Sequence, residues 1–86
     1  MGYEWDKTKC ESNLKNHGVD FADMRDFDWD ASKTIADVRS NYGEERFISI
    51  APIRNRLHVL VWTPRKNNIR VISLRKANSR EVSNYG

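Results

Sequence analysis

The sequence predicts an α+β fold, in which an antiparallel β-sheet meander packs against N-terminal helices and a short C-terminal helix ends the chain. Three strand-like segments follow one another in the second half, at 46–53, 57–63 and 69–74. Their short connections predict hairpins and hence antiparallel neighbours. Helical patterns precede these strands, an order typical of α+β proteins and not of alternating parallel βαβ units.

The chain opens with YEWD at 3–6, which is typical of a short strand. Asp6 is a favourable N-cap for a helix over 7–17, and Gly18 is well placed to end it. Polar residues separate apolar ones at helical spacing, which predicts an amphipathic helix. Cys10 and Leu14 stand four residues apart on its apolar side, with His17 about one turn further.

A second helical turn is expected at 20–27, with Asp20 as its cap. Phe21, Met24 and Phe27 repeat there at a spacing of three, and we expect them to anchor the core. A weaker strand signal follows around 34–38, before a loop rich in Ser, Asn and Gly.

The segment 57–63 is apolar on both faces, which places it in the middle of the meander. Pro52 and Pro64 lie at strand ends, where a missing N–H does least harm. The final helix is expected to begin after Asn78, because Glu81 stands three residues later and completes a capping box.

A chain of 86 residues is expected to form one domain, 1–86, with a shallow surface site. No apolar run approaches the roughly 18 residues of a membrane span, and MGYEWD lacks the features of a secretory signal. Cys10 is the single cysteine, so no internal disulfide and no cysteine-based metal site is expected. We therefore expect a cytoplasmic protein that does not bind membranes.

Positive charge is concentrated in the C-terminal part of the chain. Residues 1–50 hold 7 Lys/Arg against 11 Asp/Glu, a balance of −4, whereas residues 51–86 hold 8 against 1, a balance of +7. Such asymmetry indicates a polyanion partner. A basic solvated face is the alternative interpretation.

Arg75, Lys76 and Arg80 form the most promising basic cluster, at the end of the last strand. Strict alternation places Arg70 on one face with Ile72 and Leu74, and Arg75 on the other. Guanidinium groups bind phosphate oxygens in pairs, so these residues are candidates for holding nucleic acid.

Two histidines offer acid–base chemistry. His17, at the end of the first helix, is a candidate proton carrier, with a favourable interaction with the helix dipole as the alternative. His58 falls inside the meander, where a structural role is expected. Tyr85 could stack on a base or transfer a proton, and Trp29 and Trp62 could stack as well.

Three motifs resemble a known family. YEWDxxKxxxNLxxHGVxF at 3–21, GEERF at 43–47 and IRVISLRKAxxRE at 69–81 stand in the order and at the intervals of the BrnT toxins of type II toxin–antitoxin systems. The resemblance covers nearly the whole chain. Lys7 stands where many relatives have Pro, and Leu74 where they have Ala.

The resemblance implies a fold similar to the RelE toxins and a metal-independent endoribonuclease that inhibits translation. It implies RNA as substrate and a BrnA-like antitoxin as partner in a higher-order complex, with DNA bound only through the antitoxin. No cofactor or metal is expected. A non-catalytic nucleic-acid-binding module, or an inactive toxin that retains only antitoxin binding, is the alternative.

The expected site combines the residue analysis with the resemblance. We expect Glu81 to orient groups or act as a base, with the capping box as its alternative role. The polar residues that match the family are Lys9, Asn13, His17, Glu45, Arg46, Arg70, Arg75, Lys76, Arg80 and Glu81. The catalytic candidates are His17, Arg75, Lys76, Arg80, Glu81 and Tyr85. The RNA-binding candidates are Lys9, Lys15, Arg46, Arg56, Arg65 and Arg70.

Overall fold

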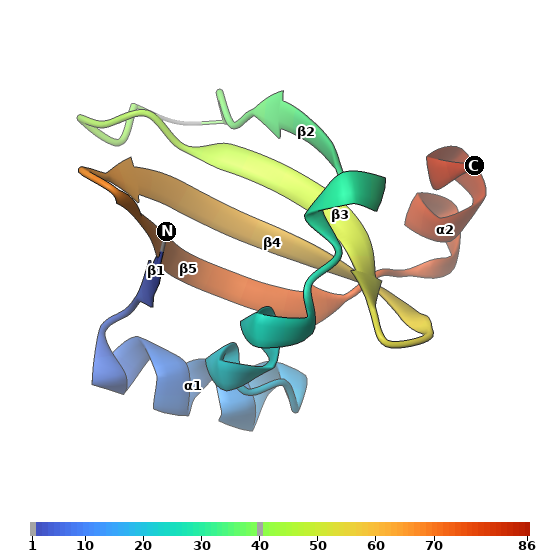
Figure 1. The fold of residues 1–86 in the computed structure, drawn as a ribbon, viewed down its shortest axis with the longest axis horizontal. Helices are drawn as coiled ribbons and strands as arrows, with labels where there is room; N and C mark the ends of the chain where they lie inside the picture. Colours follow the sequence, from blue (N-terminus) through green and yellow to red (C-terminus); the bar gives the residue numbers. More distant parts are fainter. Residues whose placement is uncertain (1, 40) are drawn as a thin grey trace.

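A computed structural model describes residues 2–39 and 41–86. Its strands form one five-stranded sheet in the order β1-β5-β4-β3-β2 (Figure 1). The elements are, in chain order, β1 (Gly2–Glu4), α1 (Lys7–His17), η1 (Phe21–Asp26), η2 (Trp29–Ala31), β2 (Lys33–Ala36), β3 (Phe47–Ile53), β4 (Arg56–Arg65), β5 (Asn68–Lys76) and α2 (Ser79–Tyr85).

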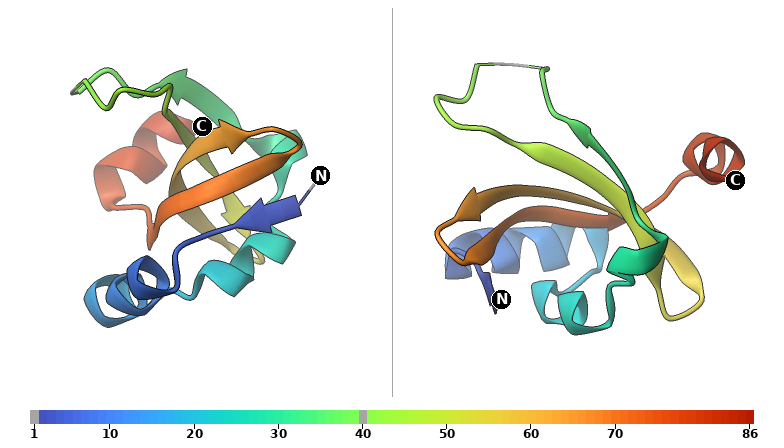
Figure 2. Two further views of the ribbon diagram at one scale, coloured as in Figure 1. Left: turned by 90° about the vertical axis from the view of Figure 1, so that its left-hand side faces the viewer. Right: turned by 45° about the horizontal axis from the view of Figure 1, so that its top comes forward.

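The predicted α+β fold is confirmed. β3, β4 and β5 form the antiparallel meander, and β4 lies in the middle of the sheet as expected. The sheet as a whole is mixed, because β1 pairs with β5 in parallel. Figure 2 shows α1 and η1 on one side of the sheet, which we call the helix-covered face, while α2 stands at one end.

A β-bulge in β5 changes which side chains share a face. Val71 pairs with Trp62 and Ser73 with Val61, so that Ile72 is the extra residue. A bulge of this kind shifts the alternation by one position. The prediction that Leu74 shares a face with Arg70 is therefore wrong: Leu74 is buried with Val71 on the helix-covered face.

As a consequence, Arg70 and Arg75 point to the same face of the sheet. Arg70 pairs with Thr63 and Arg75 pairs with Val59. Thr63 and Val59 stand four residues apart on β4, so their side chains point to the same face. We call this side the second face. The guanidinium groups of Arg70 and Arg75 therefore lie on the same side of the sheet, whereas strict alternation would place them on opposite sides.

Helix α1 is capped as predicted but presents a different residue to the sheet. Asp6 accepts hydrogen bonds from the backbone N of Thr8 at 2.8 Å and of Lys9 at 3.2 Å, and Gly18 ends the helix at φ 70°. Leu14, on the apolar side of the predicted amphipathic helix, is nevertheless 49% exposed.

The residue of α1 that is buried is Asn13. Its Nδ2 donates to the carbonyls of Val19 at 2.9 Å and Leu74 at 2.7 Å, and its Oδ1 accepts from the N–H of Leu74 at 3.1 Å. β1 pairs only with the first residues of β5, through Arg70, so the β5 edge is open beyond that point. The Asn13 amide satisfies this open edge as a neighbouring strand would.

The core lies between the helices and the helix-covered face. Phe21, Met24 and Phe27 are buried in it, as predicted. Trp29 and Trp62 pack against it, with ring centroids 5.7 Å apart in an edge-to-face arrangement. These two rings contribute to packing, because each is partly buried against the core.

Candidate functional site

The last two residues of β5 point to opposite faces of the sheet. Arg75 lies on the second face opposite Val59, whereas Lys76 lies on the helix-covered face opposite His58. Asn78 then caps α2, and Arg80 is exposed in the first turn. The exit of β5 thus gathers the predicted Arg75, Lys76 and Arg80 but directs them to different sides.

Arg75 and Glu81 form a bidentate ion pair. Nη1 and Nη2 of Arg75 each donate to one Glu81 oxygen at 2.8 Å. Glu81 Oε1 also accepts from the Asn78 backbone N at 2.9 Å, which completes the predicted capping box. The Arg75 hydrogen bonds lower the pKa of Glu81 to about 2 and raise the pKa of Arg75. Both carboxylate oxygens of Glu81 are therefore engaged in holding α2.

This pair predicts an acid-sensitive anchor for α2. The pKa of Glu81 falls from an ordinary 4.5 to about 2 in the folded chain, so the pairing stabilises fully above pH 4.5 and is lost as the pH falls toward 2. We expect the NMR amide shifts of α2 to titrate in this window, and Glu81→Gln to remove the titration. Asp37 also has its pKa lowered to about 2, but its ion pair with Arg39 belongs to the loop before β3.

The matched control is Glu11→Gln, an exposed glutamate of α1. It should leave the α2 titration unchanged. An α2 that shifts equally with pH in wild type and Glu81→Gln would show that the ion pair does not anchor it.

Tyr85 closes the other end of α2. Its hydroxyl donates to the carbonyl of Ala31, and Lys33 Nζ donates to the Tyr85 carbonyl. The same ammonium lies 5.2 Å from the centre of the Tyr85 ring. These contacts attach α2 to the segment that enters β2.

A cleft of about 440 Å³ lies beside Lys76, between the β3–β4 turn and the end of α1. Arg56 and His58 line it from β4 and Gly18 from the helix cap. His58 is only 6% exposed, and its Nδ1 lies 2.8 Å from the Arg56 carbonyl. A carbonyl accepts, so Nδ1 carries the proton and Nε2 is the basic nitrogen.

Burial lowers the pKa of His58, although the Arg56 carbonyl and the charge of Asp23 oppose this effect. The imidazole is therefore neutral at neutral pH. The sequence analysis predicted a structural role for His58, because a residue inside a strand signal offers no clue that its ring borders a cleft. Its neighbours on that cleft come from segments distant in the chain.

The basic residues near the exit of β5 differ in whether they are paired with a carboxylate. Within residues 2–39 and 41–86, Arg56, Lys76 and Arg80 have no carboxylate partner. Arg54, in contrast, binds Asp26 at 2.7 Å and Asp23 at 3.6 Å. An unpaired cation can bind a phosphate without first losing a partner.

His17 is exposed at the end of α1 and lines a neighbouring groove with Lys9. That groove runs between α1 and the bulged part of β5 at Ile72. Lys15 is also exposed on this helix. Gly18, the residue after His17, lines the cleft beside Lys76, so the end of α1 contributes one residue to each depression.

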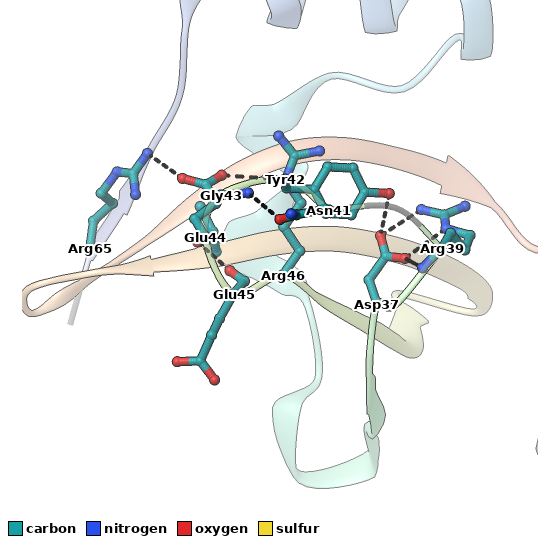
Figure 3. A network of polar contacts seen from close by, with 10 residues as sticks. Asp37, Arg39, Asn41, Tyr42, Gly43, Glu44, Glu45, Arg46 and Arg65 are labelled. Carbon is teal, nitrogen blue, oxygen red and sulfur yellow. Dashed lines mark hydrogen bonds and ion pairs between the residues drawn. The ribbon is translucent and has the colours of Figure 1, made fainter.

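The opposite end of the sheet holds the other predicted RNA-binding arginines, each bound to a carboxylate. Arg46 Nε lies 3.3 Å and Arg65 Nη2 3.1 Å from oxygens of Glu44 (Figure 3). Arg70 pairs with Glu4 at 3.4 Å. Arg65 and Arg46 lower the pKa of Glu44. The structure thus separates these three residues from Arg56.

The loop before β3 contains a network that sequence reasoning missed. The buried Asp37 accepts from Nε and Nη2 of Arg39, both at 2.7 Å, and from the Tyr42 hydroxyl at 3.3 Å (Figure 3). Arg39 lowers the pKa of Asp37 to about 2. The Arg46 guanidinium lies 4.0 Å from the centre of the Tyr42 ring, which links this network to Glu44. The sequence signal for this network was the spacing of Asp37 two residues before Arg39.

Glu45, matched to the family motif, takes another position. Its backbone carbonyl accepts from the Thr63 hydroxyl at 2.6 Å, which fixes the loop to β4. Its carboxylate points away from the network in Figure 3.

The described residues include no group of three or more His, Cys, Asp or Glu side chains placed to hold a metal ion. No helix in the described part of the chain is long and apolar enough to cross a membrane.

A small α+β sheet with a basic strand exit and shallow open clefts defines a class of protein suited to binding a polyanion on its surface. The family model described as "Ribonuclease toxin, BrnT, of type II toxin-antitoxin system" matches residues 5–81. The chain therefore belongs to the BrnT family of ribonuclease toxins, and the family inferred from the three motifs is confirmed.

A solved structure supports the same assignment. The crystal structure of the Brucella abortus ribonuclease toxin, BrnT, is similar with a TM-score of 0.74 and 25% sequence identity, over 92% of this chain and 99% of that chain. No curated protein matches the sequence.

Proposed function

We propose that this toxin cleaves RNA without a metal ion, at the end of the sheet where β5 exits. The observation that supports this position is that three cations near this end, Arg56, Lys76 and Arg80, have no carboxylate partner among the described residues. The other arginines that the sequence analysis placed in the site are each bound to a carboxylate: Arg46, Arg65, Arg70 and Arg75. The free cations can hold an RNA phosphate, whereas the paired ones order the fold.

In the proposed reaction the ribose 2′ oxygen attacks the adjacent phosphorus. The 2′-oxygen–phosphorus bond forms and the bond from phosphorus to the 5′ oxygen breaks, which gives a 2′,3′-cyclic phosphate and a 5′-hydroxyl. Negative charge accumulates on the phosphate oxygens in the transition state. Lys76 and Arg56, which line one cleft, stabilise that charge by fixed positive groups, and Arg80 adds to the field.

Two protons must move in this reaction, and two imidazoles lie at this end of the molecule. His58 has its Nδ1–H fixed by the Arg56 carbonyl, which leaves Nε2 to accept the 2′-hydroxyl proton. His17, exposed at the adjoining groove, gives a proton to the departing 5′ oxygen. Glu81 and Tyr85, both catalytic candidates from the sequence, hold α2 by their side-chain contacts, and the proposed reaction gives them no proton to move.

His58→Asn tests the first of these roles. The Asn side-chain amide can replace the Nδ1–H donor but supplies no basic nitrogen, so the fold is retained and the base is lost. We expect RNA cleavage to fall about 100-fold, while RNA binding measured by fluorescence anisotropy changes little. His17→Asn is expected to lower cleavage similarly, because it removes the proposed proton donor. A variant that cleaves at the wild-type rate at every pH would exclude its histidine.

We propose further that cleavage inhibits translation in the cytoplasm and that a BrnA-like antitoxin neutralises the toxin. Such a complex would bind DNA only through the antitoxin. Induced expression should arrest growth, and co-expression of the antitoxin should prevent the arrest. Salt-dependent RNA binding without turnover, in cells that grow normally, would instead indicate a non-catalytic binding module.

A further inference from the structure

The second face of the sheet carries a group of apolar side chains on β2, β3 and β4, and neither α1 nor η1 lies over it (Figure 2). By register, the apolar side chains that point to it are Ile35, Ile48, Ile50, Val59 and Val61, of which Val59 and Val61 are already buried. Figure 2 shows α1 and η1 on the other side. A sheet face that meets water normally carries polar side chains. A contiguous apolar face of this kind indicates a surface that a partner covers.

Helix α2 covers only one end of this face. None of its residues is buried, and its apolar Val82 is 47% exposed. Polar contacts hold it in place, through Glu81 at one end and Tyr85 at the other. Helix α2 therefore stands as a wall beside the sheet and does not fill the space in front of it.

Between α2 and the sheet lies a cavity of about 220 Å³. Its floor is formed by Ile48, Ile50 and Val59, and its rim by Ile35, which is 66% exposed. Small-molecule sites usually measure about 300–1,000 Å³, so this cavity is better suited to a few apolar side chains of a protein segment.

The chemistry of this face favours a protein over RNA. An apolar floor offers no groups for phosphates, and the arginines of the face, Arg70 and Arg75, are already bound to Glu4 and Glu81. The cation left at the rim is Lys33, which is exposed. Lys33 donates to the carbonyl of Tyr85 but pairs with no carboxylate among the described residues. An apolar surface with such a cation at its rim matches an amphipathic helix that carries an acidic residue.

We propose that this face is the docking surface for the antitoxin, which lays an amphipathic helix across it. Apolar side chains of that helix pack on Ile35, Ile48 and Ile50, and a carboxylate binds Lys33. The proposal rests on the antitoxin of the proposed function and on no detail of the cleavage chemistry. Because α2 carries Arg80, a helix docked beside α2 also hinders RNA at the β5 exit.

Two matched variants test the docking surface. Ile35→Asp places a charge on the second face, and Leu14→Asp places the same charge on α1, at a residue that is likewise apolar and 49% exposed. The antitoxin encoded beside the toxin gene is titrated into each purified toxin by calorimetry. We expect Ile35→Asp to raise the Kd at least about tenfold, and Leu14→Asp to change it less than about twofold. Lys33→Glu should also weaken binding, increasingly at low salt.

Equal affinities of the wild type and Ile35→Asp would overturn the proposal, as would an antitoxin that does not bind the wild type. Dimerisation of the free toxin that is lost in Ile35→Asp would assign the face to a second copy. Loss of RNA cleavage in Ile35→Asp, with antitoxin affinity intact, would assign it to RNA. If the wild type does not cleave RNA at all, the proposed reaction fails, whereas the calorimetric comparison still decides the docking surface.

Discussion

Lys76→Ala is expected to lower the rate of RNA cleavage about 100-fold, the typical loss when one donor to a transition-state oxyanion is removed. Lys76 is exposed beside the cleft that Arg56 and His58 line, and has no carboxylate partner among the described residues. Its loss therefore removes a positive charge from the site without uncovering a buried acid. Cleavage of a fluorescent RNA under single-turnover conditions measures the effect.

The control for this variant is Lys66→Asn, in the turn between β4 and β5. Lys66 has a positive φ of 50°, a conformation that Asn tolerates better than Ala does, so the turn is kept. Lys66→Asn should cleave at the wild-type rate. Equal losses from the two variants would mean that only overall charge matters, and a fully active Lys76→Ala would remove Lys76 from the site.

Asn13→Ala is expected to destabilise the fold by about 2–4 kcal/mol, because it leaves buried backbone groups without partners. The Asn13 amide bonds both the N–H and the carbonyl of Leu74, and also the carbonyl of Val19. A loss of this size lowers the Tm by about 10–20 °C in a chain this small. Chemical denaturation monitored by tryptophan fluorescence gives the free energy directly.

Asn16→Ala, on the same helix but exposed, is the matched control and should change the stability little. If Asn13→Ala unfolds at the wild-type denaturant concentration, the amide does not hold α1 to β5. Helix α1 would then depend on its apolar contacts alone.

Local signals in the sequence predicted most of the fold correctly. As expected, Asp6 caps the start of α1 and Gly18 ends it. Phe21 lies in the core, and the capping box of Asn78 begins α2, also as expected. Each of these features depends on residues within about one helical turn of each other. Local physical chemistry is therefore sufficient to predict them.

The features that sequence reasoning missed depend on distant partners. The parallel pairing of β1 joins Tyr3 to Ile69, and the bulge at Ile72 follows from the fit of β5 against β4. The burial of Asn13 in place of Leu14 depends on the open edge of β5. No local pattern encodes these contacts, since each needs two segments to meet first.

The candidate site shows the same division. The sequence analysis placed the basic cluster at the end of the last strand, but could not tell which cations have acidic partners. Arg75 is bound to Glu81, six residues later, whereas Arg65 is bound to Glu44 across the sheet. Lys76 remains free beside a cleft that includes His58. Only the three-dimensional contacts show which cations are held in ion pairs and which are available to bind a phosphate.

The most direct test of the proposed reaction is the identity of the RNA ends that the purified toxin produces in the presence of EDTA. Attack by the 2′ oxygen predicts fragments with 2′,3′-cyclic phosphates and 5′-hydroxyls, at the same rate with and without the chelator. Cleavage that stops in EDTA, or fragments that carry 5′-phosphates and 3′-hydroxyls, would contradict the metal-independent reaction.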